Sequence, residues 1–192
     1  MSSKQVILGI DPGTQLLGYG VISVDERGPH YLTMGVFDLR KIKEPFEKLA
    51  NIHAGVQELI EAWHPTEMAV ESPFYGKNVQ VVLKLGRAQG AAIIAATQAG
   101  IPVTEYAPRK AKIAICGNGA ASKEQVSTMI QKTLKVELSP DHLDATDALA
   151  IALCHYYEQN ALQVSSVRKK GSPKSDSWAD FLKDHPERTK NK

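Results

Sequence analysis

The sequence has few of the residues and segments that stabilise small secreted, zinc-binding or membrane proteins. Its two cysteines, Cys116 and Cys154, have no CxxC spacing, and its histidines are not clustered. Reduced core thiols are therefore expected rather than a disulfide or a zinc site. The longest weakly polar run, Ala91 to Ala96, is far too short to cross a bilayer, and no apolar signal segment precedes the first strand-like residues. We expect a cytoplasmic protein that does not associate with membranes.

The 192 residues suffice for one domain with a real core, and the chain has no internal repeat. We predict a folded domain over residues 1–164. A basic, disordered tail is expected over residues 165–192, because the apolar pattern fades there.

The net charge of +2 conceals an uneven distribution of basic residues. Residues 1–164 carry 15 Lys and Arg against 17 Asp and Glu, whereas residues 165–192 carry 8 against 4. Within the domain, the segment 77–135 carries nine cations and only two anions. A basic middle between acidic stretches suits a phosphate-binding face beside an acidic site, although solvated helix faces would explain several of these cations equally well.

The spacing of apolar residues predicts an α/β domain with a mixed sheet. Alternating or β-branched runs bounded by Gly and Pro predict strands, and apolar residues at helical spacing predict helices. The predicted strands are 5–11, 18–25, 31–39, 68–71 and 101–106. The predicted helices are 46–63, 79–99 and two more, one with a capping box formed by Ser122 and Gln125 and one that begins at Ser139-Pro140.

Four carboxylates are expected to meet at one edge of this sheet. Asp11 and Glu71 each end a predicted strand, and ligand sites in open α/β sheets lie beyond the carboxyl ends of parallel strands. Asp144 and Asp147 are three residues apart on a predicted helix and therefore share one of its faces. Negative charges this close resist joint ionisation, so the cluster would need protons or cations.

Oxygen ligands without Cys or clustered His favour Mg²⁺ or Mn²⁺. Carboxylates on separate elements can hold two such ions ~3.5–4 Å apart, which activate a water and stabilise the leaving oxygen of a phosphodiester. Each acid also has an ordinary explanation as a turn residue, a strand-end surface acid or a charge at a helix start. Their joint placement predicts a site that acts on a nucleic-acid backbone.

Four separated segments resemble one known family. GIDPGTQLLGYGVI, AVESPFYGKN, LKLGRAQGAAI and DATDALAIAL agree in order and spacing with the RuvC Holliday-junction resolvases, over roughly residues 5 to 160. The resemblance implies an RNase H-like fold, with a five-stranded mixed sheet flanked by helices, and a homodimer that grips four-way junction DNA. It also implies cooperation with the RuvA and RuvB branch-migration proteins.

The activity that the resemblance implies is that of a Mg²⁺-dependent crossover junction endodeoxyribonuclease. Such an enzyme resolves junctions by paired symmetric nicks in homologous recombination and DNA repair. Two Mg²⁺ per subunit are expected, and Mn²⁺ can substitute for them.

By position, the resemblance assigns residues to the site. The metal-binding catalytic set is Asp11, Glu71, Asp144 and Asp147. Asp144 occupies the more variable place in the family's pattern, with Asp141 and His142 close by. Lys112 and Lys123 align with lysines that contact DNA near the cut, and Phe74 matches an aromatic near the junction centre, although the preceding Ser-Pro pair departs from the family's pattern. Three cations of the basic middle complete the predicted DNA-binding set: Lys77, Lys84 and Arg87.

Three other hypotheses stay open. The Asp-Pro-Gly-Thr turn followed by Gly-Tyr-Gly also resembles the first phosphate loop of actin-like and sugar-kinase ATPases, which need two such domains. RuvC-like nucleases that act on ribosomal RNA precursors are similar too, but they are shorter and lack much of the basic middle. A non-catalytic junction-binding module would carry the acidic residues without cutting DNA.

Overall fold

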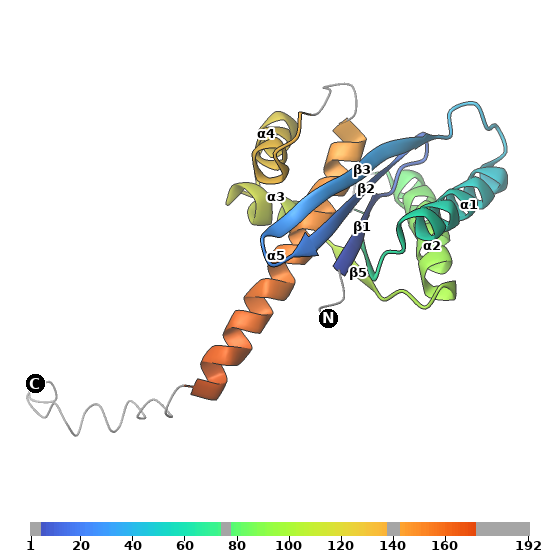
Figure 1. The fold of residues 1–192 in the computed structure, drawn as a ribbon. Helices are drawn as coiled ribbons and strands as arrows, with labels where there is room; N and C mark the ends of the chain where they lie inside the picture. The colour runs from blue at the N-terminus through green and yellow to red at the C-terminus, as the bar shows by residue number, and fades with distance from the viewer. Residues whose placement is uncertain (1–4, 74–77, 138–142, 172–192) are drawn as a thin grey trace, which may run out of the picture. The chain divides into compact units, whose positions relative to one another are not determined.

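The computed structural model describes residues 5–73, 78–137 and 143–171, with side chains as far as Ala161. The chain divides into two compact units, Met1–Glu158 and Gln159–Lys192. The first unit holds one five-stranded sheet with helices on both faces (Figure 1). The described part of the second unit is the C-terminal part of the last helix.

The sheet is mixed, as the sequence predicts. Its order is β3-β2-β1-β4-β5; β2 runs antiparallel to β1 and β3, and β4 runs parallel to β1 and β5. The two parallel pairings bring the carboxyl ends of β1 and β4 to the same edge. The strands are β1 (Gln5–Asp11), β2 (Leu16–Asp25), β3 (Gly28–Asp38), β4 (Glu67–Glu71) and β5 (Val103–Tyr106).

Two layers of helices enclose the sheet (Figure 1). The first two helices share one apolar cluster with β1, β2 and β4, and the other three share a second cluster on the opposite face. The helices are α1 (Pro45–Trp63), α2 (Val79–Gln98), α3 (Pro108–Cys116), α4 (Lys123–Leu134) and α5 (Leu143–Gly171).

The alternation of side chains along β1 determines the face of the sheet to which each side chain points. Val6, Leu8 and Ile10 are buried against α1 and α2, whereas Ile7 belongs to the cluster of α3, α4 and α5. Asp11 has the parity of Ile7, since successive strand residues point to opposite faces. The same alternation in β4 puts Glu71 on the face of Ala69, which also belongs to the α5 cluster. Both carboxylates therefore face the layer that contains α5.

Helix α5 lies so close to β1 and β2 that only glycine fits beneath its backbone. A Cβ at Gly18 would overlap the backbone oxygen of Asp144, and one at Gly9 would overlap that of Ala148. A Cβ at Gly20 would lie 2.7 Å from the Leu149 side chain. Glycines on the α5 face of the strands thus let the start of the helix settle directly beside the end of β1.

The structure corrects the predicted helix count. Helix α3 was not predicted, although Pro108 in its first turn and Gly117 in the left-handed conformation after it, at φ 70°, are ordinary start and stop signals. The capping box of Ser122 and Gln125 is confirmed at the start of α4.

The C-terminal boundary also differs from expectation. Helix α5 continues past Val164 to Gly171, so the first residues of the expected tail are helical. The remainder of that tail lies outside the described residues, as does the predicted helix start at Ser139-Pro140.

Of the helices that the structure describes, α2 alone has the length and composition to cross a membrane. Such a helix is weak evidence for a membrane span, because a core helix of a soluble protein passes the same test. Helix α2 buries Ala88, Ala92 and Ala96 in the core cluster that it shares with α1.

Candidate active site

The four predicted carboxylates come from three elements that meet at one sheet edge. Asp11 ends β1 and Glu71 ends β4, in the parallel register that pairs Ile10 with Val70. Asp144 and Asp147 lie in the first turns of α5, and the backbone of Asp144 lies directly above Gly18. Carboxylate oxygens of Asp11, Asp144 and Asp147 all lie within 4.8 Å of one another. Strand register brings Asp11 and Glu71 together, and the packing of α5 on the sheet adds acids that are more than 130 residues from Asp11 in the sequence.

The pKa values of Asp11 and Glu71 reflect this crowding. Burial raises the pKa of Asp11 to about 8, and the charges of Glu71, Asp147 and Asp144 add to the effect. Burial, followed by the charge of Asp147, raises the pKa of Glu71 to about 7, against the opposing charges of Lys123 and Lys112. Without a metal ion, the cluster therefore holds protons at neutral pH.

One ammonium group already lies among the carboxylates. Lys123 is the first residue of α4, and its Nζ lies 2.5 Å from Oδ2 of Asp147 and 3.7 Å from Oδ1 of Asp144. Burial works against the charge of Lys123, but the hydrogen bond to Asp147 and the neighbouring acids raise its pKa overall. A single positive charge does not neutralise four carboxylates, so further positive charge is favoured at this site.

The donor set suits a hard divalent cation. All four groups are carboxylates, and no histidine or cysteine belongs to the cluster in the part of the chain that the structure describes. Mg²⁺ and Mn²⁺ prefer such oxygen ligands, and each ion would replace the protons that burial otherwise holds on Asp11 and Glu71.

The raised pKa values predict how the metal-free protein responds to pH. A carboxyl whose pKa is raised by folding stabilises the folded state fully below its unfolded pKa and loses that contribution as pH rises through the folded value. In EDTA, the melting temperature should therefore fall by several degrees between about pH 5 and about pH 9. Thermal unfolding followed by circular dichroism measures this directly.

Asp11→Asn provides the control for the pH series, because asparagine has the shape of protonated aspartate and cannot ionise. We expect the variant to lose less stability than the parent over the same range and to be more stable than the parent at the alkaline end. Parallel curves for the two proteins would show that Asp11 does not hold a proton in the metal-free state.

The predicted DNA-binding residues fall into three groups. Lys112 on α3 and Lys123 on α4 lie beside the carboxylate cluster, close enough to oppose the raised pKa of Glu71. Lys84 and Arg87 are exposed on α2 and line a separate cavity. Phe74 and Lys77 lie outside the described residues, as do Asp141 and His142 near the start of α5. Both cysteines are free; Cys154 is buried and Cys116 is half-buried.

Two positioning contacts were missed from the sequence. Gln89 is buried on α2, and its side-chain amide donates to the backbone oxygen of Glu71 at 3.3 Å. Lys48 on α1 donates to the backbone oxygen of Thr14 at 3.0 Å, within the turn that follows Asp11. Gln89, a polar residue in the alanine-rich part of α2, was the available signal for the first contact. The second contact had no signal, because lysines at the surface are common.

A family model and a curated protein that match this chain have the same name. The family model described as "Crossover junction endodeoxyribonuclease RuvC" matches residues 7–155. A curated protein of that name from Bacteroides fragilis is 49% identical over 189 residues, which span 97% of each chain.

The structural comparisons agree. Thermus thermophilus RuvC is similar with a TM-score of 0.73 at 36% identity, over 82% of this chain and 96% of that one. The structure of T. thermophilus RuvC in complex with Holliday junction substrate gives a TM-score of 0.73 at 34% identity, over 82% and 96% of the two chains. The predicted RNase H-like architecture is confirmed by these similarities.

Proposed function

The chain belongs to the RuvC family of crossover junction endodeoxyribonucleases, and from this premise we propose that it resolves four-way DNA junctions by paired symmetric nicks in homologous recombination and DNA repair. The observation that carries the proposal is the cluster of Asp11, Asp144 and Asp147 beside Glu71 at the sheet edge. The proposed place of action is the cytoplasm, together with RuvA and RuvB. Family membership favours this activity over ribosomal RNA processing and over an ATPase.

We assign Asp11, Glu71, Asp144 and Asp147 as catalytic metal ligands that hold two Mg²⁺ per subunit, with Mn²⁺ able to replace them. Bound metal of this kind supplies an activated water and stabilises the leaving oxygen of a phosphodiester. Strand register holds Asp11 and Glu71 side by side, and the close approach of α5 adds the two aspartates. Lys123 neutralises part of their charge and holds Asp147 in place.

Basic side chains near the cluster would hold the DNA backbone. Lys112 and Lys123 lie beside the acids, and we assign both to phosphates near the cut. Phe74 is assigned to the junction centre on the family resemblance, and Lys77 is assigned to DNA as a cation of the basic middle. Because such contacts release counterions from DNA, junction affinity should fall steeply with salt, by roughly one unit of logarithmic slope for each phosphate contacted.

The proposed homodimer is supported by an apolar stripe along α2. Its exposed members include Val79, Leu83 and Ile94, which are 66%, 52% and 51% exposed. Gly86 and Gly90 lie on the same stripe, and a Cβ at either position would meet nothing within 4 Å. Helical spacing places all five on one face, where small residues let a second helix approach closely. A paired cut requires a second active site, and we propose that α2 of a second copy, related by two-fold symmetry, covers this stripe.

Leu83→Glu is predicted to separate the dimer. A charge in the middle of an apolar helix interface costs several kcal/mol per buried, unpaired group. We expect a monomer in analytical ultracentrifugation, and a loss of simultaneous nicks on opposite strands of the junction. Val81→Glu is the matched control, because Val81 is 46% exposed on the same helix but lies about 160° around it from Leu83. A dimeric Leu83→Glu protein would show that this stripe is not the interface.

The proposed activity is tested on three labelled substrates: a synthetic four-way junction, a linear duplex of the same sequence and a ribosomal RNA precursor. Paired nicks in the junction alone, dependent on Mg²⁺ and abolished by EDTA, are expected. Cleavage of the RNA in preference to the junction would overturn the proposal. Tight junction binding without any cut would indicate a binding module.

A further inference from the structure

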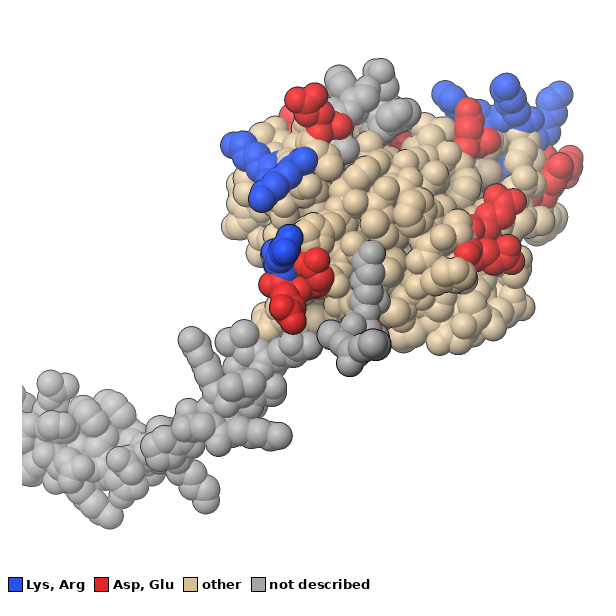
Figure 2. Space-filling model, in the orientation of Figure 1, with Lys and Arg blue, Asp and Glu red and all other residues tan. Residues whose placement is uncertain are grey.

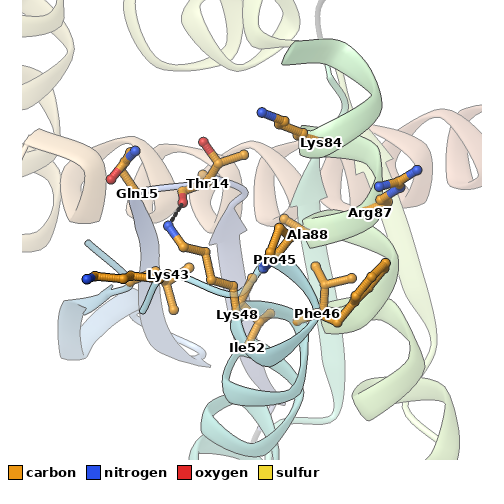
Figure 3. A pocket seen from close by; sticks show the side chains of 13 residues that line it. Thr14, Gln15, Lys43, Pro45, Phe46, Lys48, Ile52, Lys84, Arg87 and Ala88 are labelled. Carbon is orange, nitrogen blue, oxygen red and sulfur yellow. Dashed lines mark hydrogen bonds between the residues drawn. The ribbon is translucent and has the colours of Figure 1, made fainter. Parts of the chain in front are cut away.

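A cavity beside the turn that follows Asp11 is not used by the chemistry above. It lies between that turn, the start of α1 and the first half of α2 (Figure 3). Its volume is about 250 Å³. Small-molecule sites usually measure roughly 300–1,000 Å³, so this one fits a group about the size of a single nucleobase.

The rim of the cavity is positively charged. Lys43, Lys48, Lys84 and Arg87 line it, and no aspartate or glutamate does. Lys48 is held by its hydrogen bond to the backbone oxygen of Thr14, which Figure 3 shows as a dashed line. The ion pairs found among the described residues include none of the other three cations. Their charge is therefore available to an anion.

The surrounding surface supports the same conclusion. In Figure 2, basic side chains gather over the connection between β3 and α1, at the upper right. Arg40, in this connection, forms an ion pair with Asp38, with 2.7 Å between a guanidinium nitrogen and a carboxylate oxygen. Lys43, which follows it, lines the cavity instead.

The wall of the cavity is apolar and carries an exposed aromatic ring. Leu39, Ile52 and Ala88 line it and are buried in the core cluster of α1 and α2. Phe46 lines it too, yet 73% of this residue is exposed. A ring in solvent, beside an apolar hollow with a cationic rim, matches a ligand that joins a flat aromatic group to a phosphate.

We propose that this cavity binds one unstacked nucleotide of the DNA strand, with its base against Phe46 and its phosphate against Lys43, Lys84 and Arg87. The inference deepens the proposed function and rests on it. The cavity lies on the α1 and α2 face of the sheet, and it adjoins the strand end that carries Asp11, because Gly13, Thr14 and Gln15 of the following turn form part of its lining. A free nucleotide presents the same chemistry, and the test separates the two sources.

The test measures equilibrium binding of the full-length protein to a labelled four-way junction, with Ca²⁺ in place of Mg²⁺ to prevent cutting. Stacking predicts that Phe46→Ala and Phe46→Leu each weaken binding roughly tenfold, whereas Phe46→Trp binds like the parent. Lys43→Gln should lower the salt slope by about one unit. Met129→Ala is the control, because Met129 is 39% exposed on α4, away from this cavity. Unchanged melting temperatures would show that all the variants fold.

Two outcomes would overturn the proposal. Parental affinity in Phe46→Ala or Phe46→Leu would show that no base stacks on this ring. The second outcome is that deoxyadenosine monophosphate saturates the parent but not Phe46→Ala, while the two proteins bind the junction equally well. The cavity would then be a site for a free nucleotide. If the parent shows no preference for a junction over a duplex, the proposed function fails separately. In that case, the affinities of the Phe46 variants for a single-stranded oligonucleotide test the nucleotide proposal. Weaker binding by Phe46→Ala and Phe46→Leu than by the parent supports it, and equal binding overturns it.

Discussion

Asp11→Asn should abolish junction cleavage while leaving junction binding intact. The residue contributes a carboxylate oxygen to the cluster with Asp144 and Asp147, and asparagine keeps its shape without its charge. Metal-ion catalysis contributes several kcal/mol to transition-state stabilisation, so the cutting rate should fall about 10³-fold or more. Single-turnover cleavage of a labelled junction with saturating enzyme measures the chemical step apart from binding.

Asp25→Asn is the matched control for this substitution. Asp25 ends β2, is about half exposed and pairs with His30 at 2.9 Å, away from the cluster. We expect the control to cut at the parental rate. Loss of folding together with cutting in Asp11→Asn would mean that Asp11 has a structural role. A variant that still cuts at the parental rate would remove Asp11 from the catalytic set.

Gly18→Ala should damage the site without touching a carboxylate. The added methyl would overlap the backbone oxygen of Asp144, so α5 must move away from β2 and carry Asp144 and Asp147 with it. Overpacking of this kind costs about 1–3 kcal/mol of unfolding free energy, which lowers the melting temperature by several degrees. A displacement of about 1 Å at a catalytic centre can cost roughly 10²-fold in rate. Thermal unfolding and single-turnover cleavage on one preparation test both effects.

Gly35→Ala separates helix displacement from the general cost of adding a methyl to a strand. A Cβ at Gly35 would meet the outer atoms of the Tyr19 ring, 2.5 Å from its hydroxyl oxygen, and a half-buried side chain can turn aside more readily than a helix backbone. We expect this variant to cut at close to the parental rate. Equal loss of cutting in the two glycine variants would contradict the proposed role of the α5 approach.

Much of the fold could be predicted because local patterns and tertiary packing agree. The alternation of Val6, Leu8 and Ile10 with Ile7 specifies a strand buried on both faces, and the Ser122 capping box specifies where α4 begins. The convergence of Asp11 and Glu71 also follows from the sequence, because parallel strands end at a common edge.

The rest depends on contacts between distant segments. In the sequence alone, Gly18 indicates only a position that weakens a strand. The folded structure shows that Gly18 leaves room for the backbone of Asp144 when α5 packs on the sheet. The cavity is similar: Thr14, Phe46 and Lys84 come from separate parts of the chain, and no sequence pattern links them. Helix α3 was missed for a different reason, since its nine residues are too few for a clear apolar period.

The central claim is that the sheet edge holds divalent metal for cutting DNA. Anomalous scattering from Mn²⁺ in crystals of the protein with a four-way junction tests it most directly. We predict one peak bounded by Asp11, Asp144 and Asp147, a second next to Glu71, and the loss of both peaks in Asp11→Asn. The account would be contradicted if a protein that cuts junctions in solution bound Mn²⁺ elsewhere in these crystals. Lys123 would then be the only cation among the four carboxylates.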